Sequence, residues 1–370
     1  MKFSIRTFAT IATGIVVSSV LAACGSSGTG STDSTRSAPT TSVIARDRCQ
    51  QNRAAGTMTF VTSYDFSASA NILGPIVAKA EGYFDDVCLD VKIQPGFAPG
   101  NAGLVASGRA QMGSGGSMGE LMNNNLRGGG DLVAVVDYGK TAIEELVVPA
   151  NSGITRVQDL RGATIGVKGD IPYSIQTMLD LNGVPRSSLK EVLLEGFDPV
   201  AQLELGLDAL PVYKSNEPRQ LDAAGIKYRT LDPLDFKIPS SFGIQFTSRS
   251  FLQAHRSAVQ DFVRASFKGF QFGLEHPRAA VNHAIDLVKA ADGTLTLDGE
   301  LYRWKTESAI VLRSTPKGEP YGLIDVGRVQ AEAEAETRVG VFKKVPDFAT
   351  MIDGSLARSV WQGTTLRWPS

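Results

Sequence analysis

Short apolar runs alternate with longer amphipathic stretches over most of this chain. Apolar runs of four to eight residues that end in polar residues or glycine are typical of buried strands, and the stretches between them have helical spacing. The pattern begins as strand, helix, strand, and it predicts strands at 58–63, 89–93, 110–113, 132–136, 145–148, 164–167, 191–194 and 207–213. This alternation favours an α/β fold of βαβ units, with mostly parallel sheets flanked by helices.

The alternation of strands and helices breaks at two places, 137–141 and 239–243. After the second break the pattern becomes helix-rich, with helices expected at 248–254, 258–274, 279–290, 299–312, 325–338 and 347–354. Two αβ series joined by two crossings predict two lobes with a hinge between them. Residues 57–138 and 240–370 would form the first lobe, and residues 139–239 the second. A long doubly wound enzyme would give the same order of elements and stays open as an alternative.

Residues 1–24 are typical of a targeting segment rather than of a folded domain. Lys2 and Arg6 precede an apolar stretch at 8–20, and the sequence LAAC at 21–24 resembles the lipobox of bacterial lipoproteins. The resemblance implies cleavage before Cys24, lipidation of Cys24, and anchoring at the extracytoplasmic face of the cell membrane. An ordinary secretory signal and a membrane anchor are the alternatives. Residues 25–56 would then be a flexible spacer, of which 25–42 is rich in serine, threonine and glycine.

Export would place Cys49 and Cys88 in an oxidising compartment, where two thiols can form a disulfide. Cys49 precedes the first expected strand and Cys88 opens the second, so both would lie at the same end of a parallel strand pair. We expect a disulfide between them, with two unpaired thiols as the alternative. Two cysteines and three scattered histidines do not suffice for a tetrahedral zinc site, so no metal centre is expected.

The composition limits the class of partner. The 370 residues are 42% hydrophobic and 20% charged, which is typical of globular lobes. The formal net charge of −1 gives no electrostatic case for nucleic acid, whose binding domains usually carry a clustered basic surface. We therefore expect a small-molecule ligand and no nucleic-acid partner.

Aromatic and polar residues gather where the predicted strands end. In open α/β sheets, ligands bind at the carboxyl ends of the strands. Tyr64, Phe97 and Tyr138 would offer aromatic faces to a flat ring, although a single aromatic is more often a core residue. The expected ligand-binding residues are Tyr64, Asp65, Phe66, Phe97, Ser114, Gly115, Ser117, Tyr138, Lys168, Asp170, Tyr173, Asn216 and Glu217.

Three loops give these residues their expected roles. The sequence GSGGS at 113–117 can expose backbone N–H groups to an anion or to a polar ligand edge, or it can be a simple turn. Asp170 can contact a ligand or cap a helix. In the stretch 207–239 a strand end would deliver Asn216 and Glu217 into a crevice, while Pro218 suits the first turn of a helix. An ordinary connection between strand and helix is the alternative there.

Catalytic chemistry is poorly supported. His255, His276 and His283 lie in the helical C-terminal part, away from the strand ends, and no serine or cysteine nucleophile motif is present. Glu144 and Glu145 are neighbours in an expected strand and would point to opposite sides of it, which makes them a poor acid and base pair. We expect no catalytic residue, no cofactor and no enzymatic activity.

Five short motifs, taken together, resemble the spaced signatures of solute-binding lipoproteins of ABC importers. They are AEGYF at 80–84, LDV at 89–91, SGRAQ at 107–111, DLRG at 159–162 and GLDA at 206–209. The resemblance points to the branch that binds sulfonates, nitrate, taurine and thiamine pyrimidine precursors. It implies a class II periplasmic-binding-protein fold, in which two αβ lobes close on one small ligand and present it to the transmembrane subunits of an ABC permease.

Within that branch, YKSNEP at 213–218, GI at 225–226 and FKGF at 267–270 most resemble binders of aminopyrimidine thiamine precursors and their riboflavin-binding relatives. The resemblance implies that Tyr64, Tyr138, Asn216 and Glu217 contact the ligand. A carboxylate at 217 can accept hydrogen bonds from an amine or a ring N–H, which argues against a small anionic ligand. The small residues SAS at 67–69 leave room for a bulkier ligand such as a flavin.

The same superfamily contains a thiamine pyrimidine synthase, which is the enzymatic alternative for this chain. That enzyme makes the pyrimidine from pyridoxal phosphate and one of its own histidines. Its cysteine-rich iron motif has no counterpart here, and no histidine lies near the first expected strand. The sequence also departs from the solute-binding family at Val87 and Cys88, where an acidic residue and glycine are common, and the tail after Asp292 is poorly covered.

Overall fold

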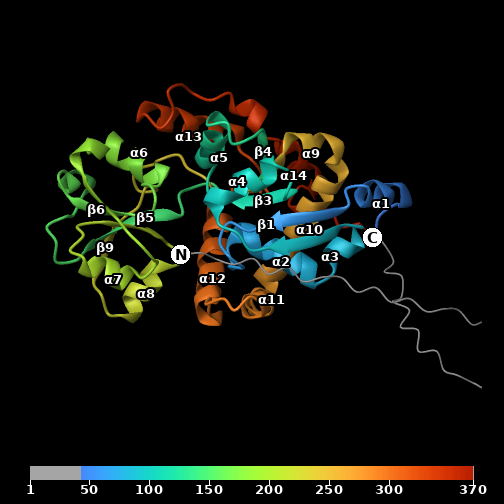
Figure 1. Cartoon of the computed structure of the whole chain (residues 1–370), viewed down its shortest axis with the longest axis horizontal. Coiled ribbons are helices and arrows are strands. Elements are labelled where there is room, and N and C mark those ends of the chain that lie inside the picture. Colours follow the sequence, from blue (N-terminus) through green and yellow to red (C-terminus); the bar gives the residue numbers. More distant parts are fainter. Residues whose placement is uncertain (1–42, 370) are drawn as a thin grey trace, which may run out of the picture. The chain divides into compact units, whose positions relative to one another are not determined.

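Two groups of strands flanked by helices make up the computed structural model, which describes residues 43–369 (Figure 1). The expected signal peptide 1–24, the lipidation site Cys24 and the spacer up to residue 42 lie outside the described residues. None of the helices in the described part of the chain is long and apolar enough to cross a membrane.

The first lobe is built on a five-stranded sheet with the order β2-β1-β3-β10-β4. β1 pairs in parallel with β2 and β3, whereas β10 runs antiparallel to both β3 and β4. β10 enters the sheet directly from the second lobe instead of through a crossover helix, so nothing forces it to be parallel. The strands are β1 (Thr57–Val61), β2 (Asp90–Gln94), β3 (Met112–Gly115), β4 (Leu132–Gly139) and β10 (Phe242–Ser248).

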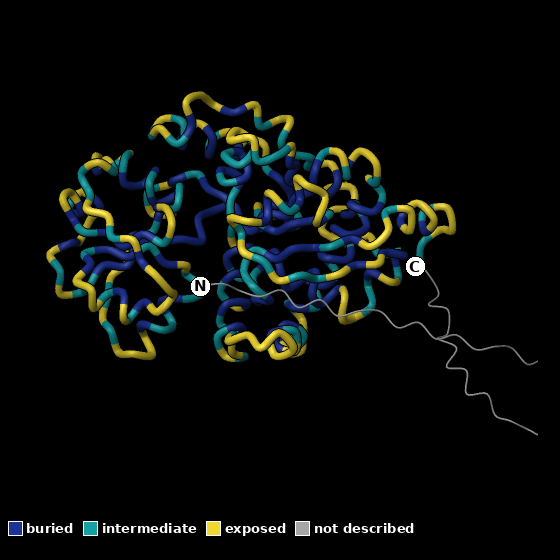
Figure 2. The backbone as a smooth tube through the Cα atoms, viewed as in Figure 1, coloured by how far each residue is buried: buried dark blue, intermediate teal, exposed yellow. Residues whose placement is uncertain are grey.

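Helices pack on this sheet, and the backbone tube is mostly dark blue, meaning buried, where Figure 1 draws its central strands (Figure 2). The tightest helix pair is formed by α2 (Ala70–Ala80) and α10 (Arg256–Glu275). They cross at Gly74, where an added Cβ would lie 2.5 Å from the Ser266 carbonyl oxygen, so only glycine fits. The other helices of this lobe before the C-terminal segment are α3 (Tyr83–Asp86), α4 (Ala98–Ala106), α5 (Met118–Leu126), α9 (Arg249–Ala254), α11 (Pro277–Ala290) and α12 (Leu297–Ser314).

The second lobe is formed by the chain between the two crossings. β5 (Glu144–Pro149) lies between β8 (Leu210–Tyr213) and β9 (Tyr228–Leu231) and is antiparallel to both, while β6 (Thr164–Val167) pairs in parallel with β7 (Lys190–Leu193). A single parallel bridge, Ile165 to Ala209, connects these two groups of strands. The helices are α6 (Tyr173–Leu181), α7 (Pro199–Glu204) and α8 (Glu217–Ala223), with short 3-10 turns η1 (Val157–Leu160) and η2 (Arg186–Ser188).

The α/β class with flanking helices is confirmed, but the sheets are mixed rather than mostly parallel. In each lobe the exception is the strand that follows a crossing, β5 or β10. The hydrophobic pattern of a strand carries no information about its direction, and both strands lack the βαβ connection that makes neighbours parallel.

The expected spacer 25–56 is wrong over its last part, because residues 46–53 form the helix α1 (Arg46–Arg53) of the folded body. Arg48 forms an ion pair with the buried Asp261 at 2.7 Å, and the Asn52 amide donates to the same carboxylate and to the Val87 carbonyl. A disulfide joins Cys49 of α1 to Cys88 before β2, with Cα atoms 5.2 Å apart. The helix is therefore attached to the first lobe by covalent and polar contacts.

The chain after α12 packs onto the first lobe. It contains α13 (Val326–Arg338), the 3-10 turn η3 (Phe348–Met351), α14 (Gly354–Ser359) and a small hairpin of β11 (Trp361–Gln362) and β12 (Thr365–Leu366). Trp361 and the buried Tyr321 belong to the same hydrophobic core as the face of α10 that carries Phe267 and Phe270.

Candidate ligand-binding site

One face of α12 carries three charged residues that are almost fully buried. Glu300, Arg303 and Glu307 are spaced three and four residues apart, so they share one face of the helix, and their exposed fractions are 2%, 7% and 5%. Buried charges persist in proteins only when they are paired and hydrogen-bonded. The hydrogen-bond and ion-pair partners of these three residues therefore indicate which groups this face of α12 binds.

Arg303 connects residues of both lobes. Its guanidinium pairs with Glu300 at 3.1 Å, donates to the Asn216 side-chain oxygen at 3.1 Å, and lies 5.6 Å from the centre of the Tyr64 ring. Burial acts to lower the pKa of Arg303, but Glu300 and Glu307 raise it by more, so the side chain stays charged. Tyr64, from the loop after β1, and Asn216, at the start of α8, are thus held beside one cation.

The two carboxylates of α12 bind backbone and hydroxyl donors. Glu300 accepts a hydrogen bond from the Ala68 N–H at 2.6 Å, and Glu307 accepts one from the Ala70 N–H at 2.7 Å. Glu307 also accepts from the Ser215 hydroxyl of the second lobe at 2.8 Å. Burial raises the pKa of Glu307. This face of α12 therefore contacts both the beginning of α2 and the loop before α8.

Glu217 is buried, with an exposed fraction of 2%, and both of its carboxylate oxygens have partners. Oε1 forms an ion pair with Lys168 at 2.8 Å, and Oε2 accepts from the Tyr213 N–H at 2.9 Å. The Lys168 ammonium, from the loop after β6, is partly exposed and lies 5.9 Å from the Phe197 ring centre. The structure thus brings Lys168, Asn216 and Glu217 together, but as an internally paired set.

Three aromatic side chains surround this polar set. The Tyr64 and Phe197 rings meet edge to face at 6.0 Å, and an antiparallel backbone bridge places Phe97 opposite Tyr64. Phe97 is 55% exposed and Phe197 51%, which is unusual for phenylalanine. Burial raises the pKa of the Tyr64 hydroxyl, while Arg303 opposes the rise. The exposed parts of the Phe97 and Phe197 rings offer surface on which a flat ligand can stack.

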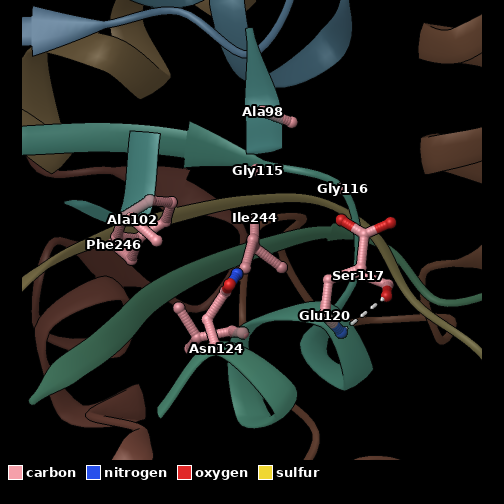
Figure 3. A pocket seen from close by; sticks show the side chains of 10 residues that line it. Ala98, Ala102, Gly115, Gly116, Ser117, Glu120, Asn124, Ile244 and Phe246 are labelled. Carbon is pink, nitrogen blue, oxygen red and sulfur yellow. Dashed lines mark hydrogen bonds between the residues drawn. The ribbon is translucent and has the colours of Figure 1, made fainter. Parts of the chain in front are cut away.

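The glycine loop after β3 lines a small pocket together with Glu120 and Asn124 (Figure 3). Ser117 begins α5, and its hydroxyl accepts from the Glu120 N–H at 3.2 Å, so it serves as a helix cap. Burial and the nearby Glu144 carboxylate raise the pKa of Glu120 to about 7. Gly115 also lines this pocket.

Further carboxylates face the same region from the second lobe. Glu144, at the start of β5, accepts from the Ser174 hydroxyl at 3.0 Å, and burial raises its pKa. Tyr213 as a residue is 43% exposed, but desolvation of its hydroxyl and the charges of Glu144, Glu120 and Glu217 raise the pKa of that hydroxyl well above its usual value. The Tyr173 hydroxyl accepts from the Asn123 amide of α5 at 2.7 Å, which is a direct hydrogen bond between the lobes. The surroundings of Tyr213 are therefore acidic.

Several expected site residues are not ligand contacts in this structure. Tyr138 is 0% exposed and stacks on Phe270 at 5.1 Å, because every residue of β4 is buried. Phe66 points into the same core, and Ser114 is a fully buried residue of β3. The assignments of Tyr138, Phe66 and Ser114 to the site are wrong, since a position at a strand end does not determine which way a side chain points.

Two expected acidic contacts have local structural roles. Asp170 forms an ion pair with Arg186 at 2.6 Å and accepts from the adjacent Ile171 N–H, whereas the N-cap position of α6 is occupied by Pro172, so Asp170 does not cap that helix. Asp65 adopts a left-handed backbone with φ of 44° and accepts from the Phe66 N–H. Neither carboxylate is among the contacts of Arg303.

Sequence reasoning missed Arg303, Glu300, Glu307 and Phe197. The helix expected at 299–312 corresponds to α12, but the expected site did not include the charged residues of this helix. The spacing of these charged residues could have indicated the site, because three charged side chains on one face of a helix are either exposed to solvent or paired with groups inside the protein. Phe197 lies in a loop without any hydrophobic period, so the pattern gave no sign of it.

The histidines lie elsewhere. His283 pairs with Glu81 at 2.7 Å, and the His255 ring lies 4.9 Å from the Phe251 ring in a tilted arrangement. Within residues 43–369, no group of three or more His, Cys, Asp or Glu side chains has a geometry that could hold a metal ion.

Known proteins share parts of this sequence and this fold. The riboflavin-binding protein RibY of Chloroflexus aurantiacus is 27% identical over 167 residues, which cover 43% of this chain and 47% of the relative, or about half its length. The structure of the periplasmic aliphatic sulphonate binding protein SsuA of Escherichia coli superposes with a TM-score of 0.61 at 15% identity, covering 85% of this chain and 94% of SsuA. The desulfurization enzyme DSZB has a TM-score of 0.54 at 14% identity, covering 82% and 98%.

At these identities the two solved structures establish the fold alone, which is that of periplasmic binding proteins. A family model gives the lineage: the model described as NMT1/THI5 like matches residues 69–280. The match runs from the start of α2 into α11 and leaves α12 outside. Because it spans more than half of the 370 residues, this chain belongs to the NMT1/THI5-like family.

Proposed function

We propose that this protein is the solute-binding lipoprotein of an ABC importer and that it captures a small, amine-bearing heteroaromatic ring between its lobes. The observation that carries the proposal is the Arg303 contact set, in which one cation holds Tyr64 of the first lobe beside Asn216 of the second. A ligand seated there touches both lobes, and closure needs such a bridge.

The surrounding side chains define the chemistry of the ligand. Phe97 and Phe197 offer exposed rings for stacking. The Asn216 side chain offers N–H donors, because its oxygen already accepts from Arg303 and Gln220.

The carboxylates of Glu120, which lines the pocket after β3, and of Glu217, which accepts from the Tyr213 N–H, favour a ligand with N–H donors or positive charge. An aminopyrimidine thiamine precursor or a riboflavin-like ring has this character, and the partial similarity to a protein named for riboflavin binding supports the second.

The mechanism is a shift between open and closed lobes. A ligand that contacts both lobes binds the closed form more tightly, and the closed form is then recognised by the permease. Hydrogen bonds between the lobes, such as Asn123 to Tyr173 and Ser215 to Glu307, provide part of the closing free energy. Lipid on Cys24 would keep the protein at the extracytoplasmic face of the membrane, near that permease.

A thermal-shift panel on residues 43–370 tests the proposal. Aminopyrimidine thiamine precursors, thiamine, riboflavin, alkyl sulfonates, nitrate, and pyridoxal phosphate with iron are compared. A ligand at about 100 times its dissociation constant adds about 2.7 kcal/mol of stability, which a melting curve resolves. A shift with a pyrimidine or flavin supports the proposal, a shift with sulfonates alone overturns the ligand class, and a response to pyridoxal phosphate favours the synthase alternative.

A further inference from the structure

The beginning of α2 is a place where an anion would ordinarily be stabilised. The first N–H groups of a helix have no partner within the helix, and the helix dipole favours negative charge there. The residue that precedes α2, Ser69, forms no side-chain hydrogen bond to the helix. The Ile72 and Leu73 N–H groups donate to the Ser69 carbonyl, so it is the Ala68 and Ala70 N–H groups that take a partner from elsewhere.

That partner comes from the far end of the sequence. Glu300 and Glu307 accept from the Ala68 and Ala70 N–H groups across 232 and 237 residues. Both carboxylates are buried, and both distances are those of strong, charge-assisted hydrogen bonds. The carboxylates of Glu300 and Glu307 therefore occupy the position at which an external anion would bind.

These carboxylates adjoin the proposed ligand site. Arg303, between them on α12, contacts Tyr64 and Asn216, and Glu307 reaches Ser215, the neighbour of Asn216. A ligand held by Tyr64 and Asn216 would therefore place its groups beside Glu300 and Glu307. Two cations of this region, Arg303 and Lys168, are already paired with Glu300 and Glu217.

We propose that Glu300 and Glu307 are specificity-determining residues that exclude anionic ligands, such as sulfonates, sulfate and carboxylates, from this site. The exclusion has two causes. The Ala68 and Ala70 N–H groups already donate to Glu300 and Glu307. Arg303 neutralises one of these two carboxylates, so one net negative charge remains and repels an anion with little water to screen it. The inference rests on the proposed function, whose ligand class it narrows to neutral or cationic rings.

Isothermal titration of the full chain with sodium methanesulfonate tests the inference, using wild type, Glu300→Gln, Glu307→Gln and the double variant. Glutamine keeps the size and one acceptor oxygen but removes the charge. Because the double variant leaves the buried Arg303 without a carboxylate partner, a melting curve of each variant first establishes that it is folded. The double variant is expected to bind methanesulfonate at least about tenfold more tightly than wild type. Asp298→Asn, at an exposed acid in the first turn of α12, is the matched control and should change nothing.

A second experiment uses the wild-type protein and varies the pH. Burial raises the pKa of Glu307, so mild acid should neutralise it and increase methanesulfonate binding to wild type. Tight binding of methanesulfonate to wild type at neutral pH would overturn the inference. It would also be overturned if the folded variants, and wild type in mild acid, bound methanesulfonate no more tightly than wild type at neutral pH. Riboflavin and aminopyrimidine titrations run in parallel report on the proposed function alone, because their failure leaves the methanesulfonate comparison intact.

Discussion

At the scale of single residues, Arg303 is the side chain on which most contacts of the site converge. It neutralises Glu300, acts on Glu307, orients Asn216 and covers one face of Tyr64. A buried cation among these groups both stabilises the fold and positions the residues of the site. Its removal therefore affects stability and binding together.

Replacing Arg303 with methionine should lower the free energy of unfolding by about 3–5 kcal/mol, because two buried carboxylates lose their counter-charge. Chemical denaturation measures this loss, and the ring ligand identified by the thermal-shift panel should bind more weakly. Lys305→Met, at an exposed position of the same helix, is the control. A stability equal to that of wild type would show that the buried charges are not coupled through Arg303.

Glu217 contributes through its two partners rather than as a free acceptor. Glu217→Ala should weaken ring binding by at least about 1.5 kcal/mol, the scale of one hydrogen bond to a charged group, because Lys168 and the loop at Tyr213 lose their common partner. Titration calorimetry checks the value, with Glu204→Ala at an exposed position of α7 as the control. Unchanged affinity would remove Glu217 from the site.

At the scale of elements, α1 and α12 show how segments outside the βαβ pattern complete the first lobe. α1 is attached through the Cys49–Cys88 disulfide and through Asp261 of α10. α12 lies outside the matched family region and supplies the buried charges of the site. The sheet forms the framework of the first lobe, and α12 adds the charged residue that contacts Tyr64 and Asn216.

Replacing both Cys49 and Cys88 with serine should destabilise the folded body by about 4 kcal/mol, because the disulfide closes a loop across 39 positions and so limits the unfolded chain. Denaturant melts of the variant and of wild type under reducing conditions should agree. Ligand affinity should stay the same, because neither cysteine contacts the residues around Arg303. A variant as stable as wild type would indicate that the contacts of Arg48 and Asn52 alone hold α1.

At the scale of the whole molecule, the accumulation of buried carboxylates makes stability depend on pH. Glu332 of α13 accepts from Ser241 and from the Gly119 N–H, and burial raises its pKa. Burial also raises the pKa of Glu336, and the charge of Glu332 raises it further. Together with Glu120, these groups take up protons when the chain folds near neutral pH.

The sign of the effect follows from the raised pKa values. A carboxyl whose folded pKa exceeds its ordinary 4.5 contributes its full stability below that value and loses it as pH rises through about 7, the folded pKa of Glu120. The melting temperature should therefore fall between pH 5 and 8. Each group changes the free energy of unfolding by about 1.4 kcal/mol for every unit by which folding raises its pKa. Glu332→Gln should flatten the profile, whereas Glu334→Gln at an exposed position should not. A melting temperature that rises over this range would contradict the assignment.

The sequence by itself determined most of the elements and their order, since local hydrophobic period is what distinguishes a strand from a helix, but it predicted neither α1 nor β10. It also indicated the two crossings between lobes and placed Tyr64, Asn216 and Glu217 at strand ends. Only the tertiary structure decided the direction of β5 and β10 and the burial of Tyr138 in the core. It likewise decided that Glu300 and Glu307 reach back more than 200 residues to α2. The reason is physical: period depends on neighbours in sequence, whereas strand direction and long-range pairing depend on how distant elements pack.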